Sequence, residues 1–276
     1  MSPALLLLLV PVLPAQDSRW SLTFAPAEML YPPYIADPRR PTFSLSKVDT
    51  RESDIPAAGD SRYGIRMGTR FPIVQFHPPG EPGGGLQLAG EMGFLAQFDR
   101  DNSTDNLGWD GIYGFHLAWL ARPDLVLRVG MSHDSSHLGD EYIETTGRER
   151  IEYTRQEYLG GIRYAPVESL ATYLEYGWAY DLRNEDLMER GRAQGGLEFE
   201  PEPTLSNRRV APYAALDVSA YEEDDWEENL TVQVGLVRPA RRTWRLGLEY
   251  YDGRSTIGEL FQERERHLAL GLWLDL

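Results

Sequence analysis

A histidine and a serine stand two residues apart at the end of an alternating segment, in the order His133-Asp134-Ser135. The segment begins at Leu125, and its odd-numbered residues are apolar up to this pair. Because successive side chains of a strand point to opposite faces, His133 and Ser135 share one face and Asp134 lies on the other. An imidazole beside a hydroxyl can take its proton and make it a nucleophile. The spacing therefore predicts a candidate hydrolytic pair, with Ser135 as nucleophile and His133 as general base.

A third side chain is needed to orient the imidazole, and the next alternating segment, 151–164, offers two candidates. When the even-numbered residues of this segment are taken as the matching face, Glu152 and Gln156 lie on it. The alternative interpretation gives the histidine and the serine no chemical role and treats them as polar residues that end a strand.

Period-two alternation recurs along most of the chain and predicts about twelve strands. They lie near residues 43–47, 63–71, 86–98, 109–119, 125–135, 151–164, 170–181, 188–199, 208–221, 230–236, 244–251 and 268–276. A soluble sandwich or a lipocalin-like barrel would show the same period, with the apolar face inward. Aromatic residues near strand ends, such as Trp109 and Trp119, instead match the interfacial girdles of membrane barrels. We therefore predict an all-β fold, a transmembrane antiparallel β-barrel of about 12 strands.

The polar faces of these strands predict a lumen filled by ion pairs. The residues expected to form them are Arg66, Arg70, Arg128, Arg163 and Arg245 with Glu91, Glu175, Glu198 and Glu249. A barrel of this size leaves little interior space, so a wide channel is not expected and a narrow pore is the open alternative. An even strand count puts both termini on the periplasmic side, with short turns there and longer loops outside.

Composition divides the chain into three parts. An apolar run that ends shortly before Ala15 predicts a signal peptide over 1–15, followed by a periplasmic N-terminal segment, 16–41, and an outer-membrane β-barrel, 42–276. The chain has no cysteine, so neither a cysteine-linked lipid anchor nor a disulfide framework is available. Its net charge of -16 excludes nucleic acid as a partner, because phosphate binding requires an excess of Lys and Arg.

A family resemblance rests on three segments, Glu28–Pro41, His133–Tyr142 and Tyr250–Ser255. They are similar to a family of bacterial envelope proteins known as the domain of unknown function number twelve-oh-seven. The resemblance spans nearly the whole mature chain and implies an envelope location but no activity.

A narrower similarity concerns the pair His133 and Ser135, which resembles the His-x-Ser pair of outer-membrane phospholipase A and, more loosely, of the lipid A 3-O-deacylases. Both families carry the pair on the outward face of a barrel strand near the outer leaflet. The phospholipase completes its triad with an Asn on the next strand and the deacylase with a Glu. The segment 151–164 contains no Asn, so Glu152 and Gln156 are the candidates for that position.

A developing oxyanion would need donors, and a bound cation held by Asp140 could supply them, with calcium as the candidate cofactor. Backbone N–H groups between Ser136 and Gly139 are the alternative oxyanion donors. The acidic segment Asp99–Asp105 has oxygen ligands at alternate positions but lacks the glycine of a calcium loop, so an ordinary hairpin loop is expected. The acidic run Glu222–Glu228 is expected to be a solvated loop, with divalent-cation binding as the alternative.

The sequence therefore supports two functions. The preferred one is an acyl hydrolase that acts on outer-leaflet lipids, either phospholipid or lipid A, through a lipid-facing His133 and Ser135. Its rival is a non-enzymatic structural or narrow-pore barrel of unknown role. The expected partners are outer-membrane lipids; a homodimer is left open, and no protein partner is identifiable from the sequence.

Overall fold

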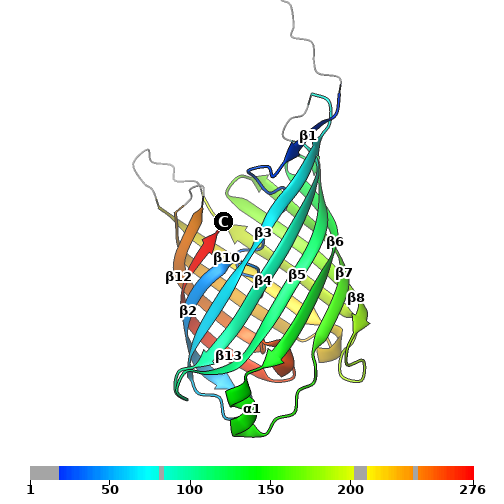
Figure 1. The fold of residues 1–276 in the computed structure, drawn as a ribbon. Coiled ribbons are helices and arrows are strands. Elements are labelled where there is room, and N and C mark those ends of the chain that lie inside the picture. The colour runs from blue at the N-terminus through cyan, green and yellow to red at the C-terminus, as the bar shows by residue number, and fades with distance from the viewer. Residues whose placement is uncertain (1–18, 81–83, 202–209, 239–241) are drawn as a thin grey trace, which may run out of the picture.

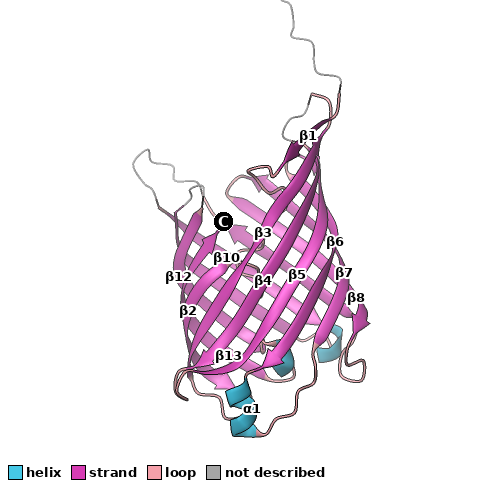
Figure 2. Cartoon of the chain, viewed as in Figure 1, coloured by secondary structure: helices cyan, strands magenta, loops and turns pink. Residues whose placement is uncertain are grey.

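The computed structural model describes residues 19–80, 84–201, 210–238 and 242–276. Within these residues, twelve long strands form a closed antiparallel barrel (Figures 1 and 2). They are β2 (Phe43–Ser53), β3 (Ser61–His77), β4 (Gly85–Asp99), β5 (Asp105–Arg122), β6 (Leu125–Leu138), β7 (Thr154–Val167), β8 (Leu170–Leu182), β9 (Gly191–Phe199), β10 (Ala211–Tyr221), β11 (Glu228–Arg238), β12 (Thr243–Arg254) and β13 (Arg264–Asp275). The ring closes where β13 pairs with β2, and a short strand β1 (Ser21–Phe24) pairs with the end of β3. The predicted 12-strand all-β barrel is confirmed.

The alternation along each strand separates an apolar exterior from a polar interior. On β12, the outward side chains of Leu246 and Leu248 are 54% and 53% exposed. The inward side chain of Glu249 on the same strand is only 3% exposed. A soluble sandwich or lipocalin-like barrel would bury the leucines and expose the glutamate, which is the reverse of what is found. An exterior of exposed leucine, valine and aromatic side chains requires lipid around it. The protein is therefore an outer-membrane β-barrel.

The two ends of the barrel differ in their connections. The end that holds β1 and the carboxyl terminus has tight turns, such as those after Arg122 and Val167 (Figure 1). The other end carries longer loops that include α1 (Asp140–Thr146), η1 (Glu222–Asp224) and η2 (Gly258–Leu260). This is the asymmetry expected of a barrel whose termini are periplasmic. No helix in the described part of the chain is long and apolar enough to cross a membrane.

The predicted ion pairs of the lumen are found. Four of them join the arginines and glutamates that the alternation placed inside, namely Arg66–Glu249, Arg70–Glu91, Arg128–Glu175 and Arg163–Glu198. Arg245 instead pairs with Glu200 and Asp275. Each of these charges is removed from bulk water, so pairing is what makes its burial tolerable.

Residues 29–42, directly before β2, lie inside the barrel. Tyr34 donates a hydrogen bond of 2.9 Å to Glu175 Oε2, and its ring stacks on Tyr173 with 3.6 Å between ring centroids. The backbone N–H of Ile35 donates to Glu198 Oε1 over 2.7 Å. The sequence predicts 16–41 as a periplasmic segment ahead of the barrel; residues 29–41 of that range lie in the lumen.

The charge balance of the wall explains why this segment enters. Asp110 is fully buried and Asp134 is mostly buried, and both carboxylates pair with Arg39 of the N-terminal segment. Nearer the end of the barrel that holds the carboxyl terminus, Arg40 Nη2 lies 3.5 Å from Asp275 Oδ1. The barrel wall alone would leave these carboxylates short of cations, so the arginines of the segment complete its electrostatics. The proposed signal peptide, 1–15, lies outside the described residues.

A loop and a helix cover the outer mouth of the barrel. Apolar residues from five loops and strand ends pack together there, with Ile257 and Leu260 of the loop between β12 and β13 at the centre. The other members of this cluster are Ile55, Leu107, Leu138 and Tyr142. The lumen is thus closed at this end by the protein's own loops.

The closed ladder predicts resistance to detergent unfolding. Because each of the twelve long strands pairs with a neighbour on both sides, sodium dodecyl sulfate has no open strand edge from which to unfold the barrel. Unheated protein is expected to migrate ahead of the boiled chain on a dodecyl sulfate gel. A protein that stays monomeric in buffer without detergent would contradict the membrane barrel.

Candidate active site

His133 and Ser135 lie on the outward face of β6, near its loop end. The His133 ring stacks on Tyr113 of β5, with 4.5 Å between ring centroids and 22° between the planes. Ser135 faces Gly111 across the same strand pair. A β-carbon placed on Gly111 would come 3.7 Å from Ser135 Oγ, so the glycine leaves the space beside the hydroxyl open. The His133 ring is thus held against the Tyr113 ring, whereas the Ser135 hydroxyl lies beside open space at Gly111.

Gln156 lies directly opposite His133, because the register of β6 and β7 pairs these two residues. Its side-chain amide is fixed from β8: Nε2 donates to Asp181 Oδ2 over 2.6 Å, and the Tyr180 hydroxyl donates to Oε1 over 3.1 Å. The register of β7 and β8 shifts at this point: Gln156 pairs with Asp181, the next residue Glu157 pairs with Ala179, and Tyr180 is left out of the pairing. Both Tyr180 and Asp181 can therefore contact Gln156. Such a β-bulge redirects side chains and is frequent beside functional sites.

The hydrogen bonds of the described residues do not yet link these groups into a relay. His133 Nδ1 is buried without a partner, and neither Ser135 nor Gln156 bonds to the ring. Gln156 Oε1 has a second lone pair, so it can accept a hydrogen bond from an imidazole N–H. In enzymes without substrate, catalytic hydrogen bonds are often long or unformed.

Glu152, the other candidate for orienting the imidazole, lies before the start of β7. Its backbone is in the left-handed region, with a φ of 55°, and its carboxylate pairs with Arg183 at 3.0 Å. Both side chains are more than half exposed. The register therefore brings Gln156 to His133 and leaves Glu152 in the neighbouring cleft.

Glu259 of η2 holds the backbone around Glu152 from the inside of the barrel. Its carboxylate oxygens accept the backbone N–H groups of Ile151, at 2.8 Å, and Tyr153, at 3.0 Å. The backbone N–H of Glu259 in turn donates to Ser136 Oγ over 2.8 Å. A buried lumen loop thus fixes the chain on both sides of the outward cleft.

The outward surface changes from apolar to polar at the level of His133 and Gln156. Toward the middle of the barrel it exposes large apolar side chains, namely Val129, Met131, Tyr158, Leu174, Tyr176 and Trp178. Toward the loops it opens into a cleft of about 410 Å³, lined among others by Ser135, Arg150, Glu152, Gln156, Asp181 and Arg183. Such a boundary is what a strand presents where hydrocarbon gives way to headgroups.

Asp140, the candidate cation ligand, lies outside the lining of this cleft. It lies exposed at the start of α1, and no three His, Cys, Asp or Glu side chains of the described chain converge as a metal site. The alternative oxyanion donors are also engaged, because the N–H of Ser136 donates to Tyr153 O and that of Gly139 to Leu107 O. Asp140 thus lies outside the lining of the cleft, and the N–H groups of Ser136 and Gly139 already have acceptors within the protein.

The two acidic segments are used by the protein itself. Asp99 accepts hydrogen bonds from the N–H of Gly59 and from Asn102 within the loops at the outer end. In the acidic run Glu222–Glu228, Glu223 and Asp224 both pair with Arg254 at 2.9 Å. Asp99, Glu223 and Asp224 thus have partners within the protein.

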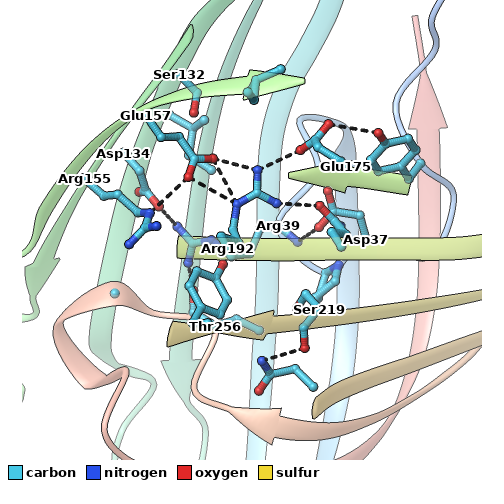
Figure 3. A pocket seen from close by; sticks show the side chains of 18 of the residues that line it. Asp37, Arg39, Ser132, Asp134, Arg155, Glu157, Glu175, Arg192, Ser219 and Thr256 are labelled. Atoms are coloured by element: carbon cyan, nitrogen blue, oxygen red, sulfur yellow. Dashed lines mark hydrogen bonds and ion pairs between the residues drawn. The ribbon is translucent and has the colours of Figure 1, made fainter. Parts of the chain in front are cut away.

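A second cavity, of about 110 Å³, lies inside the lumen (Figure 3). Arg192 lies there between Glu157, at 2.6 Å, and Glu175, at 2.7 Å. Asp134 points into this cavity toward Arg39, away from Ser135. The described lining contains no histidine, and most of its charged side chains form ion pairs with one another.

Comparison with known proteins assigns a family. Residues 10–275 match the model described as "Protein of unknown function (DUF1207)". The chain belongs to this family. No curated protein matches it.

Solved structures show what the DUF1207 fold is similar to. Outer membrane phospholipase A from Escherichia coli superposes with a TM-score of 0.61 at 12% identity, covering 85% of this chain and 92% of that one. The phospholipase dimer with bound calcium from Salmonella typhi gives 0.58 at 12% identity, with 87% and 93% covered. An active-site mutant of the E. coli enzyme, with asparagine changed to alanine, gives 0.57 at 12% identity, with 90% and 94% covered. At this identity the likeness concerns the fold.

Sequence reasoning missed the residues that support the site from neighbouring strands. Strict alternation put Asp181 on the lumen face of β8, whereas the bulge turns it outward to Gln156. Tyr180 and Tyr113 belong to the apolar and aromatic faces of their strands, and nothing in their spacing marked them as partners of Gln156 and His133. Only the strand register reveals these contacts.

Proposed function

We propose that this protein is an outer-membrane acyl hydrolase of lipids. The observation that carries the proposal is the placement of His133 and Ser135 on the outward face where the apolar surface ends, with Gln156 directly across from the imidazole. A lipid can reach such a site by lateral diffusion, and its acyl chains never have to leave hydrocarbon. The similar fold of a phospholipase supports this reading.

In the proposed reaction Ser135 Oγ attacks the carbonyl carbon of a lipid ester while His133 takes the hydroxyl proton. The ester C–O bond then breaks, and the imidazolium returns that proton to the departing alcohol oxygen. Water hydrolyses the acyl-serine, again with His133 as the base, and releases the fatty acid. Gln156 accepts the other ring N–H and holds the imidazole in the productive tautomer.

The test is fatty-acid release by the purified barrel in detergent micelles. Phospholipid and lipid A are supplied separately, each with calcium and with a chelator. Because the similar Salmonella typhi phospholipase is described as a dimer with bound calcium, the mass of the protein–detergent complex is measured in the same samples. Release of fatty acid from one lipid class supports the proposal; turnover of neither class under any of these conditions overturns it.

The second candidate is a non-enzymatic structural barrel, and the filled lumen favours it over a narrow pore. The N-terminal segment contacts Glu175 and Glu198 in the middle of the wall, and the loop cluster around Leu260 covers the mouth. Such a barrel gives no single-channel conductance in planar bilayers. It is distinguished from the hydrolase by the absence of lipid turnover.

A further inference from the structure

The cleft beside Ser135 gathers four charged side chains of both signs. Arg150 and Arg183 carry positive charges, and Glu152 and Asp181 carry negative ones. Equal numbers of opposite charges in one cleft give it no net charge. Its ligand would therefore be one that itself carries both signs, since a polyanion would find only two guanidinium groups and two repelling carboxylates.

The charged groups of the cleft can exchange their present partners for a ligand. The pair between Glu152 and Arg183 is 61% and 66% exposed at its two side chains, and a pair in contact with water contributes at most about 1 kcal/mol. Arg150 is held at one end, where Nη2 lies 2.6 Å from His137 Nδ1 and Nε lies 3.8 Å from the buried carboxylate of Glu259. His137 itself stacks on Trp109 with 4.2 Å between centroids. Arg150 is thus positioned by its contacts and yet lines an open space.

The cleft also lies in the right place for the polar part of a lipid. It extends from Ser135 toward the loops, whereas the exposed apolar side chains lie on the other side of the His133 level. A lipid whose ester carbonyl is at Ser135 would lay its acyl chains along Met131 and Tyr158. Its headgroup would then extend into the charged cleft.

We propose that this cleft binds the zwitterionic headgroup of a phospholipid, with Arg150 and Arg183 at the phosphate and Glu152 at the ammonium group. Guanidinium groups donate paired hydrogen bonds to phosphate oxygens, and a carboxylate accepts those of an ammonium group. This inference deepens the proposed function, because it names phospholipid rather than lipid A as the substrate class. The net charge of -16 adds to the discrimination against polyanionic lipids.

The experiment measures binding by the Ser135→Ala barrel, which cannot form the acyl-serine. Dihexanoyl phosphatidylethanolamine, dihexanoyl phosphatidylglycerol and dihexanoylglycerol are titrated by calorimetry in a non-ionic detergent. The phosphatidylethanolamine is expected to bind about tenfold more tightly than the glycerol ester without phosphate, since its phosphate accepts charge-assisted hydrogen bonds from the two guanidinium groups. The phosphatidylglycerol is expected to fall between them.

Three further substitutions locate the headgroup. Arg150→Gln and Arg183→Gln, each made in the Ser135→Ala background, should reduce phosphatidylethanolamine binding to the level of the glycerol ester. Glu152→Gln should reduce it to the level of phosphatidylglycerol. Arg122→Gln is the matched control, because Arg122 is exposed and lies at the opposite end of the barrel. Equal binding of all three lipids, or unchanged selectivity in the two arginine variants, would overturn the headgroup site.

The outcomes separate this inference from the proposed reaction. Selective binding by the Ser135→Ala barrel combined with no fatty-acid release by the wild type would support the headgroup site and reject the hydrolase. Hydrolysis of lipid A and of the three dihexanoyl lipids at equal rates would support the hydrolase and reject the headgroup site.

Discussion

Replacing Ser135 by alanine is expected to lower fatty-acid release by at least about 10³-fold, because the alanine has no hydroxyl to attack the ester. His133→Ala should cause a loss of the same order, since the serine hydroxyl then has no base. The double variant should be no slower than either single one, because the two side chains act as a unit.

Gln156→Ala should lower the rate of fatty-acid release about tenfold, which is the value of one hydrogen bond to the imidazole.

The matched control for these variants is Ser132→Ala. Ser132 belongs to the same strand, β6, but its even position places it on the lumen face, where it lines the inner cavity. It should keep the wild-type rate, and the gel shift on boiling shows whether each variant has folded. If Ser135→Ala retained the full rate while Ser132→Ala lost it, the nucleophile would be on the wrong side of the wall and the mechanism would be rejected.

Arg39→Ala is expected to cost about 3–5 kcal/mol of stability, because it removes the cation shared by the buried carboxylates of Asp110 and Asp134. The N-terminal segment would lose a principal anchor in the lumen. We therefore expect a lower midpoint of urea unfolding in detergent micelles and measurable conductance in planar bilayers, where the wild type is expected to give none.

Two companion variants make the result specific. Arg51→Ala removes an arginine whose pair with Asp49 is 59% and 60% exposed, so it should leave both the unfolding midpoint and the conductance unchanged. Adding Asp134→Asn to Arg39→Ala should restore part of the stability, because one unpaired charge is removed. Conductance by the wild type equal to that of Arg39→Ala would show that the segment does not block the lumen.

The sequence predicted the wall of the barrel well because the wall follows a local rule. Alternation alone assigned Arg128 and Glu175 to the lumen face, and it did so for the other charged residues that form the lumen pairs, although it did not indicate which arginine meets which glutamate. Where the rule is interrupted the prediction failed. One bulge in β8 turned Asp181 from the predicted lumen face to the lipid side.

Contacts between distant parts of the chain could not be predicted at all. Arg39 and Asp110 are separated by most of two hairpins, and no spacing relates Glu259 to Tyr153. The alternation also says nothing about a segment without regular structure, so the entry of residues 29–42 into the lumen had no signal in the pattern. The contacts of the candidate site could not be predicted for the same reason. His133 and Ser135 were found from the pattern of one strand, whereas the side chains around them come from β5, β7 and β8.

The position of Glu259 has a consequence for the order of assembly. This residue comes from the connection between β12 and β13, the last hairpin of the chain, yet it fixes Ile151 and Tyr153 beside the cleft. A chain that has inserted its earlier strands but has not yet docked this hairpin therefore lacks the inner support of the outward site. The cleft at Ser135 reaches its final form when the last seam of the barrel closes, so an unfinished barrel carries its candidate nucleophile without a shaped site around it.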